Sequence, residues 1–323
     1  MFEKLMGKPK TSTEFYFFSG KGGVGKTSMA AATAMWFAGQ GRKTLIISTD
    51  PAHSLSDSFD VKVGGDLKEL KKNLSAVEID PQKAMAEYKE KLAPHIQKIS
   101  YLEGMGLEDV FDVGGLTPGI DEIAAFDKFL HFMNSNDYDV IIFDTAPTGH
   151  ALRFLSLPDV IDSWVGKMIK IRMKLSGFMN MFKKILPFGD PEKDSEFGVG
   201  QLEEMKERIE QAKQILTNPV KTHYNMVLIP EIMSILESER AVHTLNEYGI
   251  PVETIIVNQI FPEKTGCDFC QAKRRQQLER IKIIDDKFGK MKIRKVELMK
   301  QEVGGFSSLE GLAKKIYSDS GSS

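Results

Sequence analysis

The chain has 323 residues, of which 41% are hydrophobic and 27% charged, and its 43 basic and 45 acidic side chains give a formal net charge of −2. This is the composition of an ordinary globular protein, and the balanced charge argues against a nucleic-acid partner, which usually requires a broad basic field. The N-terminal stretch MFEKLMGKPKTSTEF has no apolar run suited to a signal peptide, and no uncharged stretch of about 18 apolar residues occurs, so we expect a cytoplasmic protein.

Short apolar runs recur along the chain, and each is followed by helical or polar sequence. They lie at residues 14–19, 43–48, 75–79, 138–143, 224–229 and 254–258. Runs of this kind predict strands that are buried on both faces of a mainly parallel sheet, with helices covering it. The predicted fold class is therefore α/β, with a doubly wound sheet.

Two mostly helical regions interrupt this alternation, at about 82–135 and about 159–218. We interpret them as helical insertions, which form an inserted α-helical subdomain. Residues 1–323 then make a single domain, with its core at about 14–81, 136–158 and 219–316. The Ser- and Gly-rich tail, 317–323, is expected to be disordered.

The stretch GKGGVGKT, Gly20–Thr27, matches the phosphate-loop pattern GxxxxGK[ST] between the first predicted strand and a helical pattern at 27–37. Its backbone N–H groups and the following helix N-terminus would hold the phosphates of ATP or ADP. Lys26 would pair with the β- and γ-phosphates, and the Thr27 hydroxyl would ligate Mg²⁺. The alternative is a glycine-rich turn without a ligand, which the flanking strand and helix disfavour. The expected nucleotide-binding residues here are Gly20, Lys21, Gly22, Gly23, Val24, Gly25, Lys26, Thr27 and Ser28.

Two aspartates come just after predicted strands, where open α/β sheets place their ligands. Asp50 lies in STDPAHSLSDSF and Asp144 begins DTAPTGHALRFL. Asp144 is positioned to hold Mg²⁺ through water, and Asp50 is a candidate for orienting or deprotonating the attacking water. A lone aspartate after a strand is often only a helix cap or a turn residue, so the position alone leaves both roles open.

The wider sequence carries a resemblance. Lys21 directly follows the first glycine, and KGGVGKT resembles the deviant phosphate loop of the dimeric ATPases that include ParA, MinD, nitrogenase iron protein and ArsA. DPAHSLSD and DTAPTGHALR resemble the two switch loops of the ArsA/guided-entry ATPase family, most closely its branch that targets tail-anchored membrane proteins. The likeness spans roughly residues 14–316.

The resemblance implies a P-loop ATPase that works as a homodimer. Lys21 would reach across the dimer interface to the partner's nucleotide and act there as a catalytic charge stabiliser. Lys26 would act on the nucleotide bound to its own chain. Asp50 would be the catalytic acid–base residue. Glu231 in LIPEIMS and Asn258 in IIVNQ match family positions that contact the nucleotide, Asn258 through adenine.

Cys267 and Cys270, in TGCDFCQAKRRQQ, offer two thiolates, whereas a structural zinc site normally needs four ligands. A two-fold axis through one Cys₄ site would join two chains through a shared Zn²⁺. The competing interpretation is a redox pair of the thioredoxin type. The targeting branch resembled above has a CxxC followed by QA at this place.

The stretch WVGKMIKIRMKLSGFMNMFKKILPF, residues 164–188, has apolar side chains at alternating spacings of four and three. One interpretation is a pair of ordinary amphipathic helices packed on the sheet. In the targeting branch, however, the insertion after the second switch forms part of a groove for a client's transmembrane helix, and methionines suit varied apolar partners. The expected client-binding residues are Met168, Ile171, Leu175, Phe178, Met179 and Phe182.

The function implied by the resemblance is that of an ATP-hydrolysing targeting factor that binds tail-anchored proteins and delivers them to a membrane. A membrane receptor and transient membrane association follow from that role. The enzymatic alternative is an ATPase subunit that drives an arsenite or anion pump. The non-enzymatic alternative is a nucleotide-gated scaffold in which turnover is incidental.

Overall fold

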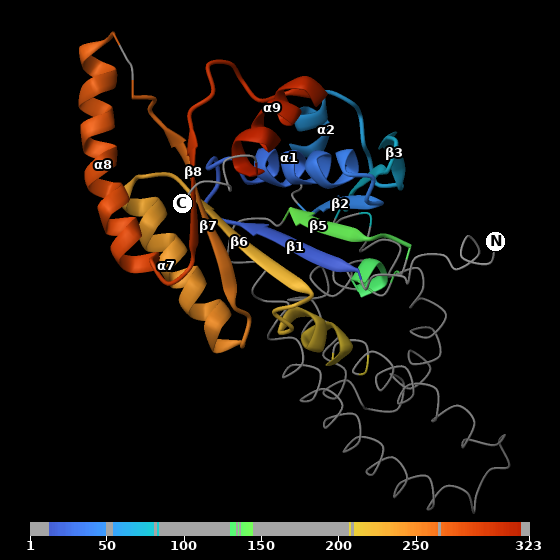
Figure 1. Ribbon diagram of the computed structural model, residues 1–323. Coiled ribbons are helices and arrows are strands. Elements are labelled where there is room, and N and C mark those ends of the chain that lie inside the picture. The colour runs from blue at the N-terminus through green and yellow to red at the C-terminus, as the bar shows by residue number, and fades with distance from the viewer. Residues whose placement is uncertain are drawn as a thin grey trace, which may run out of the picture.

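The computed structural model describes residues 13–49, 54–80, 83, 130–133, 135, 137–144, 207, 210–263 and 266–317. Within this part of the chain, one eight-stranded sheet has the order β3-β4-β2-β5-β1-β6-β7-β8 (Figure 1). The strands are β1 (Glu14–Ser19), β2 (Thr44–Ser48), β3 (Lys68–Lys71), β4 (Leu74–Glu78), β5 (Val140–Asp144), β6 (Thr222–Leu228), β7 (Val252–Ile260) and β8 (Lys292–Glu297). Neighbours pair in parallel, except β3 with β4, which confirms the mainly parallel α/β sheet.

The six strands predicted from apolar runs are all present, with ends that differ by a few residues. The sequence patterns missed β3 and β8, the two edge strands. Their sequences, KELK and KIRKVE, are rich in charge because an edge strand is not covered on all sides, so they lack the continuous apolar signal of the buried strands.

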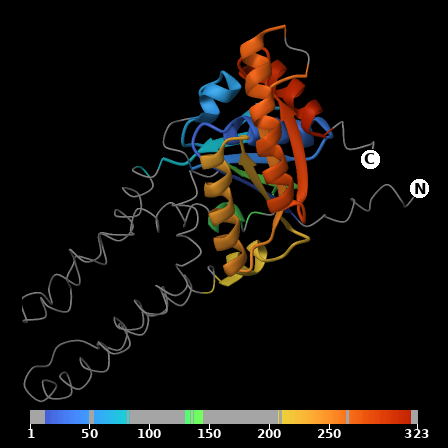
Figure 2. The same ribbon diagram turned by 90° about the vertical axis from the view of Figure 1, so that its left-hand side faces the viewer.

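Helices cover both faces of the sheet, as Figures 1 and 2 show. On one face lie α1 (Lys26–Gly39), α2 (Ser54–Phe59) and α9 (Gly305–Tyr317), and on the other α7 (Ile232–Glu247) and α8 (Asp268–Phe288) together with helical residues 130–133 and 210–216. In β2, Leu45 and Ile47 belong to one core and Ile46 to the other. This alternation explains why the central strands are apolar throughout.

The C-terminal helix α9 packs along α1. The Tyr317 ring stacks on Trp36 with centroids 5.3 Å apart, and the Tyr317 hydroxyl lies 2.9 Å from Thr33 Oγ1. Tyr317 was expected to begin the disordered tail, but these contacts hold it at the end of the helix; residues 318–323 lie outside the described residues. The two predicted insertions also lie mostly outside them, and their extent stays a prediction.

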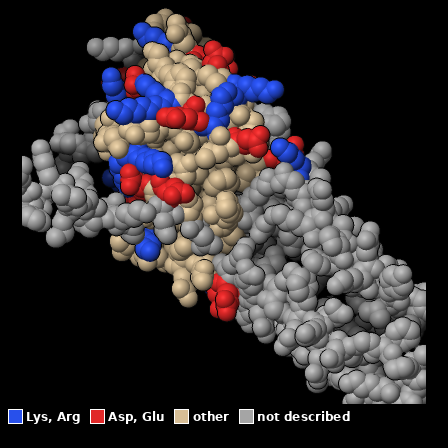
Figure 3. Space-filling model, turned by 90° about the vertical axis from the view of Figure 1, so that its right-hand side faces the viewer, with Lys and Arg blue, Asp and Glu red and all other residues tan. Residues whose placement is uncertain are grey.

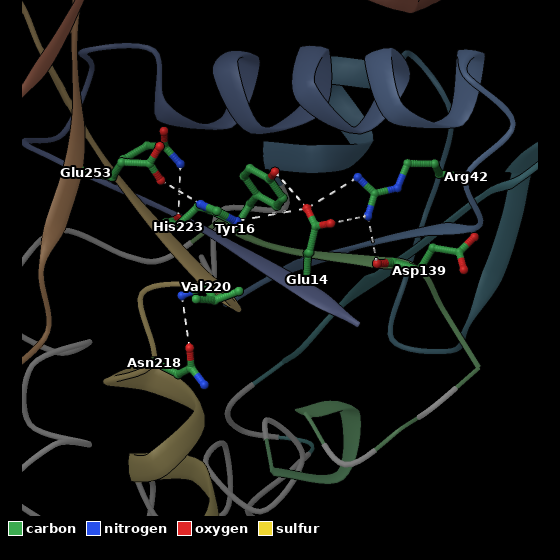
Figure 4. A network of polar contacts seen from close by, with 9 residues as sticks. Glu14, Tyr16, Arg42, Asp139, Asn218, Val220, His223 and Glu253 are labelled. Atoms are coloured by element: carbon green, nitrogen blue, oxygen red, sulfur yellow. Dashed lines mark hydrogen bonds and ion pairs between the residues drawn. The ribbon is translucent and has the colours of Figure 1, made fainter. Parts of the chain in front are cut away.

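A polar network connects the strands at the end of the sheet opposite the phosphate loop (Figure 4). Glu14 Oε1 forms an ion pair with Arg42 Nη2 at 2.9 Å, and the Tyr16 hydroxyl donates to Glu14 Oε2 at 3.1 Å. His223 stacks on Tyr16 with centroids 4.6 Å apart, and its Nδ1 lies 2.6 Å from Glu253 Oε2. Burial and the neighbouring Glu14 carboxylate raise the pKa of Tyr16 above its ordinary value. This network joins β1, β6 and β7 and therefore contributes to the stability of the sheet.

Candidate nucleotide-binding site

The phosphate loop, Gly20–Lys26, connects the carboxyl end of β1 to the first turn of α1 and lies against the ends of β6 and β7. A Cβ at Gly20 would lie 2.0 Å from the Val227 carbonyl oxygen, and a Cβ at Gly25 would lie 2.5 Å from Asn258 Nδ2. Gly25 also has φ +93°, a left-handed conformation that side chains disfavour. Gly20 and Gly25 are therefore needed here for close approach, and Gly25 also for its left-handed backbone.

The two lysines of the loop have different surroundings. The Lys26 side chain is buried, and its Nζ donates to the Lys21 carbonyl oxygen at 3.2 Å, so the ammonium points back over the loop. Phosphate oxygens bound in the loop would offer this ammonium a stronger, charged acceptor. The Lys21 side chain leaves the loop toward α7, where its Nζ lies 3.4 Å from Glu237 Oε1.

Oxygen atoms from α1, α2, β2 and β5 meet beside the phosphate loop. Thr27 Oγ1 donates to Asp144 Oδ2 at 2.7 Å and lies 3.3 Å from Ser54 Oγ. Ser48 Oγ donates to the same Asp144 oxygen at 3.4 Å. The side chain of Asp144 is almost fully buried at the end of β5.

This donor set fits Mg²⁺, which in nucleotide sites takes a hydroxyl and one or two carboxylates and completes its shell with water and phosphate. The described residues contain no group of three or more His, Cys, Asp or Glu side chains that could hold a metal. A nucleotide-bound Mg²⁺ does not need such a group, because the phosphates supply ligands. Thr27 and Asp144 are thus brought together as the sequence predicted.

The two other nucleotide-contact candidates lie at the same edge of the sheet. Asn258 Nδ2 donates to the Val24 carbonyl oxygen at 2.9 Å, which places this side chain directly against the phosphate loop. Glu231 is the residue before α7, just beyond the carboxyl end of β6, and its side chain is exposed. Ser28 lies in the first turn of α1.

Asp50 lies outside the described residues, and its catalytic role stays a prediction. The nearest described residues on either side, Thr49 and Ser54, lie beside Asp144 and Thr27. The Thr49 backbone N–H donates to the Asp144 carbonyl oxygen at 3.1 Å, and Ser54 lies beside Thr27. The expected client-binding residues also lie outside the described residues: Met168, Ile171, Leu175, Phe178, Met179 and Phe182.

Glu78 was missed by the sequence reasoning. Its buried carboxylate accepts from the Ser56 backbone N–H and from Ser56 Oγ, both at 2.9 Å, and so fixes α2 directly after the segment that contains Asp50. A signal was available, because Glu78 closes an apolar strand at the edge where Asp144 closes another. A carboxylate in that position has to find hydrogen-bond donors.

The cysteine pair opens helix α8. Cys267 is the N-cap residue, and its sulfur accepts from the Cys270 backbone N–H at 3.4 Å. Hydrogen bonds from Cys270 lower the pKa of the Cys267 thiol, whereas the interaction with Cys267 raises the pKa of Cys270. Both thiols are free, and Cys267 is exposed. A lowered pKa favours the thiolate, which is the form that binds metal or attacks a disulfide.

A model of the anion-transporting ATPase family, ArsA, matches residues 13–318. The chain belongs to the ArsA ATPase family. It is 35% identical over 329 residues to ATPase GET3B of Arabidopsis thaliana, covering 95% of this chain and 79% of that protein. It is 34% identical over 310 residues to ATPase get3 of Schizosaccharomyces pombe, covering 95% and 92%. A putative arsenical pump-driving ATPase of Chlorobaculum tepidum is 33% identical over 308 residues, covering 94% and 75%.

Membership in the ArsA family confirms the resemblance seen in the two switch sequences and the phosphate loop, and it makes the chain an ATPase. The eight-stranded sheet is consistent with the P-loop fold of this family. Among the described residues, no helix combines the length and apolarity needed to cross a bilayer. The side of the molecule seen in Figure 3 carries Lys and Arg side chains intermixed with Asp and Glu on its described part.

Proposed function

We propose that this ArsA-family ATPase is a homodimeric targeting factor, which holds the transmembrane helix of tail-anchored proteins in a nucleotide-controlled apolar groove. It would work in the cytoplasm and release its client at a membrane receptor, with which it associates transiently. The similarity to ATPases named GET3B and get3 supports this role, as does the resemblance of the switch sequences to the targeting branch.

The observation that carries this proposal is the Cys267–Cys270 pair, of which Cys267 is exposed and Cys270 half-buried. The first turns of α8 extend beyond the sheet in Figures 1 and 2, and residues 267–269 are exposed there. Two thiolates on one helical turn supply half of a tetrahedral Zn²⁺ site, and a second copy of the same turn supplies the other half. The pair would thereby join two chains through one shared metal.

The position of Cys267 at the N-cap of α8 also supports the redox alternative, because a lowered thiol pKa at a helix N-terminus is typical of reactive cysteines. Metal analysis distinguishes the two. We expect about one zinc per two chains in protein purified without chelator, with loss of the dimer in the Cys267→Ser variant. A metal-free dimer that forms an internal disulfide on mild oxidation would refute bridging zinc.

Hydrolysis would use residues at the carboxyl edge of the sheet. The phosphate loop would bind the nucleotide, and Lys26 would hold the β- and γ-phosphates. Thr27 directly and Asp144 through water would hold a magnesium ion, which when bound supplies positive charge beside the phosphates. Asp50 would orient and deprotonate the attacking water. We expect Asp50→Asn to abolish hydrolysis while nucleotide binding stays largely intact; full turnover in that variant would refute the assignment.

Lys21 would act on the partner's nucleotide in the closed dimer. Its ion pair with Glu237 is compatible with this movement, since the two side chains are 38% and 32% exposed. Partly exposed pairs of this kind contribute only about 0 to 1 kcal/mol, so the pair is readily exchanged for a phosphate. Lys21→Ala is expected to lower turnover much more than ADP affinity, and equal losses in both would contradict a role in trans.

Client binding is assigned to the second insertion. Closure of the dimer would bring two copies of it into one groove, and opening would split the groove. The triple variant Met168→Asp, Met179→Asp, Phe182→Asp should lose client capture and keep basal ATP hydrolysis. Undiminished capture would return this stretch to ordinary core packing.

An arsenite- or anion-pump ATPase is the second candidate, because one of the similar proteins is a putative arsenical pump-driving ATPase. That function predicts stimulation of ATP hydrolysis by arsenite. The targeting function predicts no such stimulation, and instead predicts recovery of a hydrophobic C-terminal helix in soluble form. The two outcomes separate the candidates on the same purified protein.

A further inference from the structure

The end of β7 is attached to the phosphate loop by two consecutive amide side chains. Asn258 Nδ2 donates to the Val24 carbonyl oxygen at 2.9 Å, and Gln259 Nε2 donates to the Gly23 carbonyl oxygen at 3.3 Å. Consecutive residues of a regular strand point to opposite faces, so they do not normally reach the same loop. The local backbone must therefore depart from strand geometry at this point.

The structure shows that departure. The pairing of β7 with β8 shifts register between Val257 and Ile260, and Gln259 has φ +58°. A left-handed backbone is unfavourable for a residue with a long side chain, and it persists only where surrounding contacts hold it.

Helix α8 supplies contacts that hold Gln259 in this conformation. Gln277 Nε2 donates to the Gln259 carbonyl oxygen at 3.0 Å, and Gln277 Oε1 accepts from the Phe261 backbone N–H at 2.8 Å. One side chain thus bonds the backbone on both sides of Ile260. Arg274, one helical turn before Gln277, donates to the Phe261 carbonyl oxygen. These bonds connect the distorted end of β7 to the half of α8 that begins with the cysteine pair.

We propose that Gln277 is a positioning residue for the phosphate loop, acting through Gln259, and that these contacts transmit nucleotide occupancy from the loop to α8. When phosphate binding draws the Gly23 and Val24 peptides into place, Gln259 moves with them, and Gln277 carries the displacement to the helix. The coupling free energy is reciprocal, so the free energy that nucleotide binding contributes to the displacement of α8 is the free energy that this displacement contributes to nucleotide binding. The inference deepens the proposed function, since α8 carries the proposed zinc ligands, but its test needs neither zinc nor a second chain.

The test compares the 323-residue protein with three single variants and one double variant. Gln277→Leu removes both hydrogen bonds of Gln277 and leaves that of Arg274. Gln259→Gly removes the bond to Gly23 while favouring the left-handed backbone, so it should fold even if the first variant does not. Gln276→Leu is the matched control, because Gln276 is the exposed neighbour of Gln277 on the same helix.

Fluorescent ADP with Mg²⁺ is titrated into each protein, and hydrogen exchange of residues 268–280 is followed with and without Mg·ADP. We expect Gln277→Leu and Gln259→Gly each to weaken ADP binding about three- to tenfold, the loss expected for one or two hydrogen bonds. The double variant should be no weaker than the worse single one, since both changes break the same connection. Mg·ADP should slow exchange in 268–280 in the parent and in Gln276→Leu, and not in the other variants.

Parent-like ADP affinity in both variants, strictly additive losses, or an exchange response to Mg·ADP that survives both changes would overturn the proposal. So would the absence of any response in the parent protein. A negative result for Gln277 would not argue against bridging zinc, because the zinc hypothesis is tested by metal content and oligomeric state. Conversely, a protein without bridging zinc would still show the connection between Gly23 and α8.

Discussion

Replacing Gly25 with Ala tests the geometry of the phosphate loop most sharply. The new Cβ would lie 2.5 Å from Asn258 Nδ2, and the backbone at φ +93° disfavours any side chain. The left-handed conformation costs about 1 to 2 kcal/mol. Displacing Asn258 breaks its hydrogen bond to the Val24 carbonyl oxygen, which removes about another 1 kcal/mol.

The total cost of Gly25→Ala is about 2 to 3 kcal/mol. It can be observed as a loss of stability or as a loss of ADP affinity. If the loop keeps its shape, the free energy of unfolding falls by this amount, which for a chain of this length corresponds to a decrease in Tm of roughly 3 to 5 °C. If the loop relaxes to relieve the contact, stability is retained and ADP affinity falls by roughly thirtyfold or more. Thermal unfolding and an ADP titration on the same protein measure both quantities.

Gly22→Ala is the control for stability. A Cβ at Gly22 would meet no atom within 4 Å, and its backbone is not left-handed, so the unfolding free energy should stay within about 0.5 kcal/mol of the parent. Parent-like stability together with parent-like ADP affinity in Gly25→Ala would refute the reasoning. Equal destabilisation by the two alanines would refute the role given to Asn258.

Three further changes test other parts of the site and the sheet. Asp144→Asn should lower Mg²⁺-dependent hydrolysis at least about tenfold, because the carboxylate bonded to Thr27 loses its charge; an unchanged Mg²⁺ titration would contradict this. Glu78→Gln should reduce the unfolding free energy by about 2 kcal/mol in a urea titration, since an amide N–H₂ group would then face donors of Ser56; an unchanged midpoint would count against it. Burial raises the pKa of Tyr16, so its protonated form stabilises the fold below about pH 10 and this contribution is lost as the pH rises further; Tyr16→Phe should flatten the fall in Tm between about pH 10 and 12, and a parallel fall in both proteins would refute it.

The parts of the site that the sequence predicts are those with short-range signals. The phosphate loop is a contiguous pattern, and buried parallel strands are continuous apolar runs. From these two it follows that Asp144 lies near Thr27, because the carboxyl ends of parallel strands meet at one edge. The register confirms this, with Phe18 of β1 and Ser48 of β2 both opposite Asp144.

The parts that escape sequence reasoning depend on long-range contacts. Nothing near Gln259 in the sequence announces a left-handed backbone, because its shape is set by Gln277, which lies 18 residues away on α8. His223 and Glu253 likewise meet only because β6 and β7 are neighbours in the sheet. A contact between two unremarkable polar residues leaves no periodic pattern, and so single-sequence reasoning has no signal for it.

The claim that nucleotide state controls the capture of a membrane helix is tested most directly by co-expression with a tail-anchored client. We expect the client to be recovered in soluble form with two copies of this chain, and to be released when the complex is incubated with Mg·ATP. In the Asp50→Asn variant, the complex should form but should not release its client by hydrolysis. The claim would be contradicted if the client stayed insoluble with the parent protein and arsenite stimulated the ATPase activity of the parent protein.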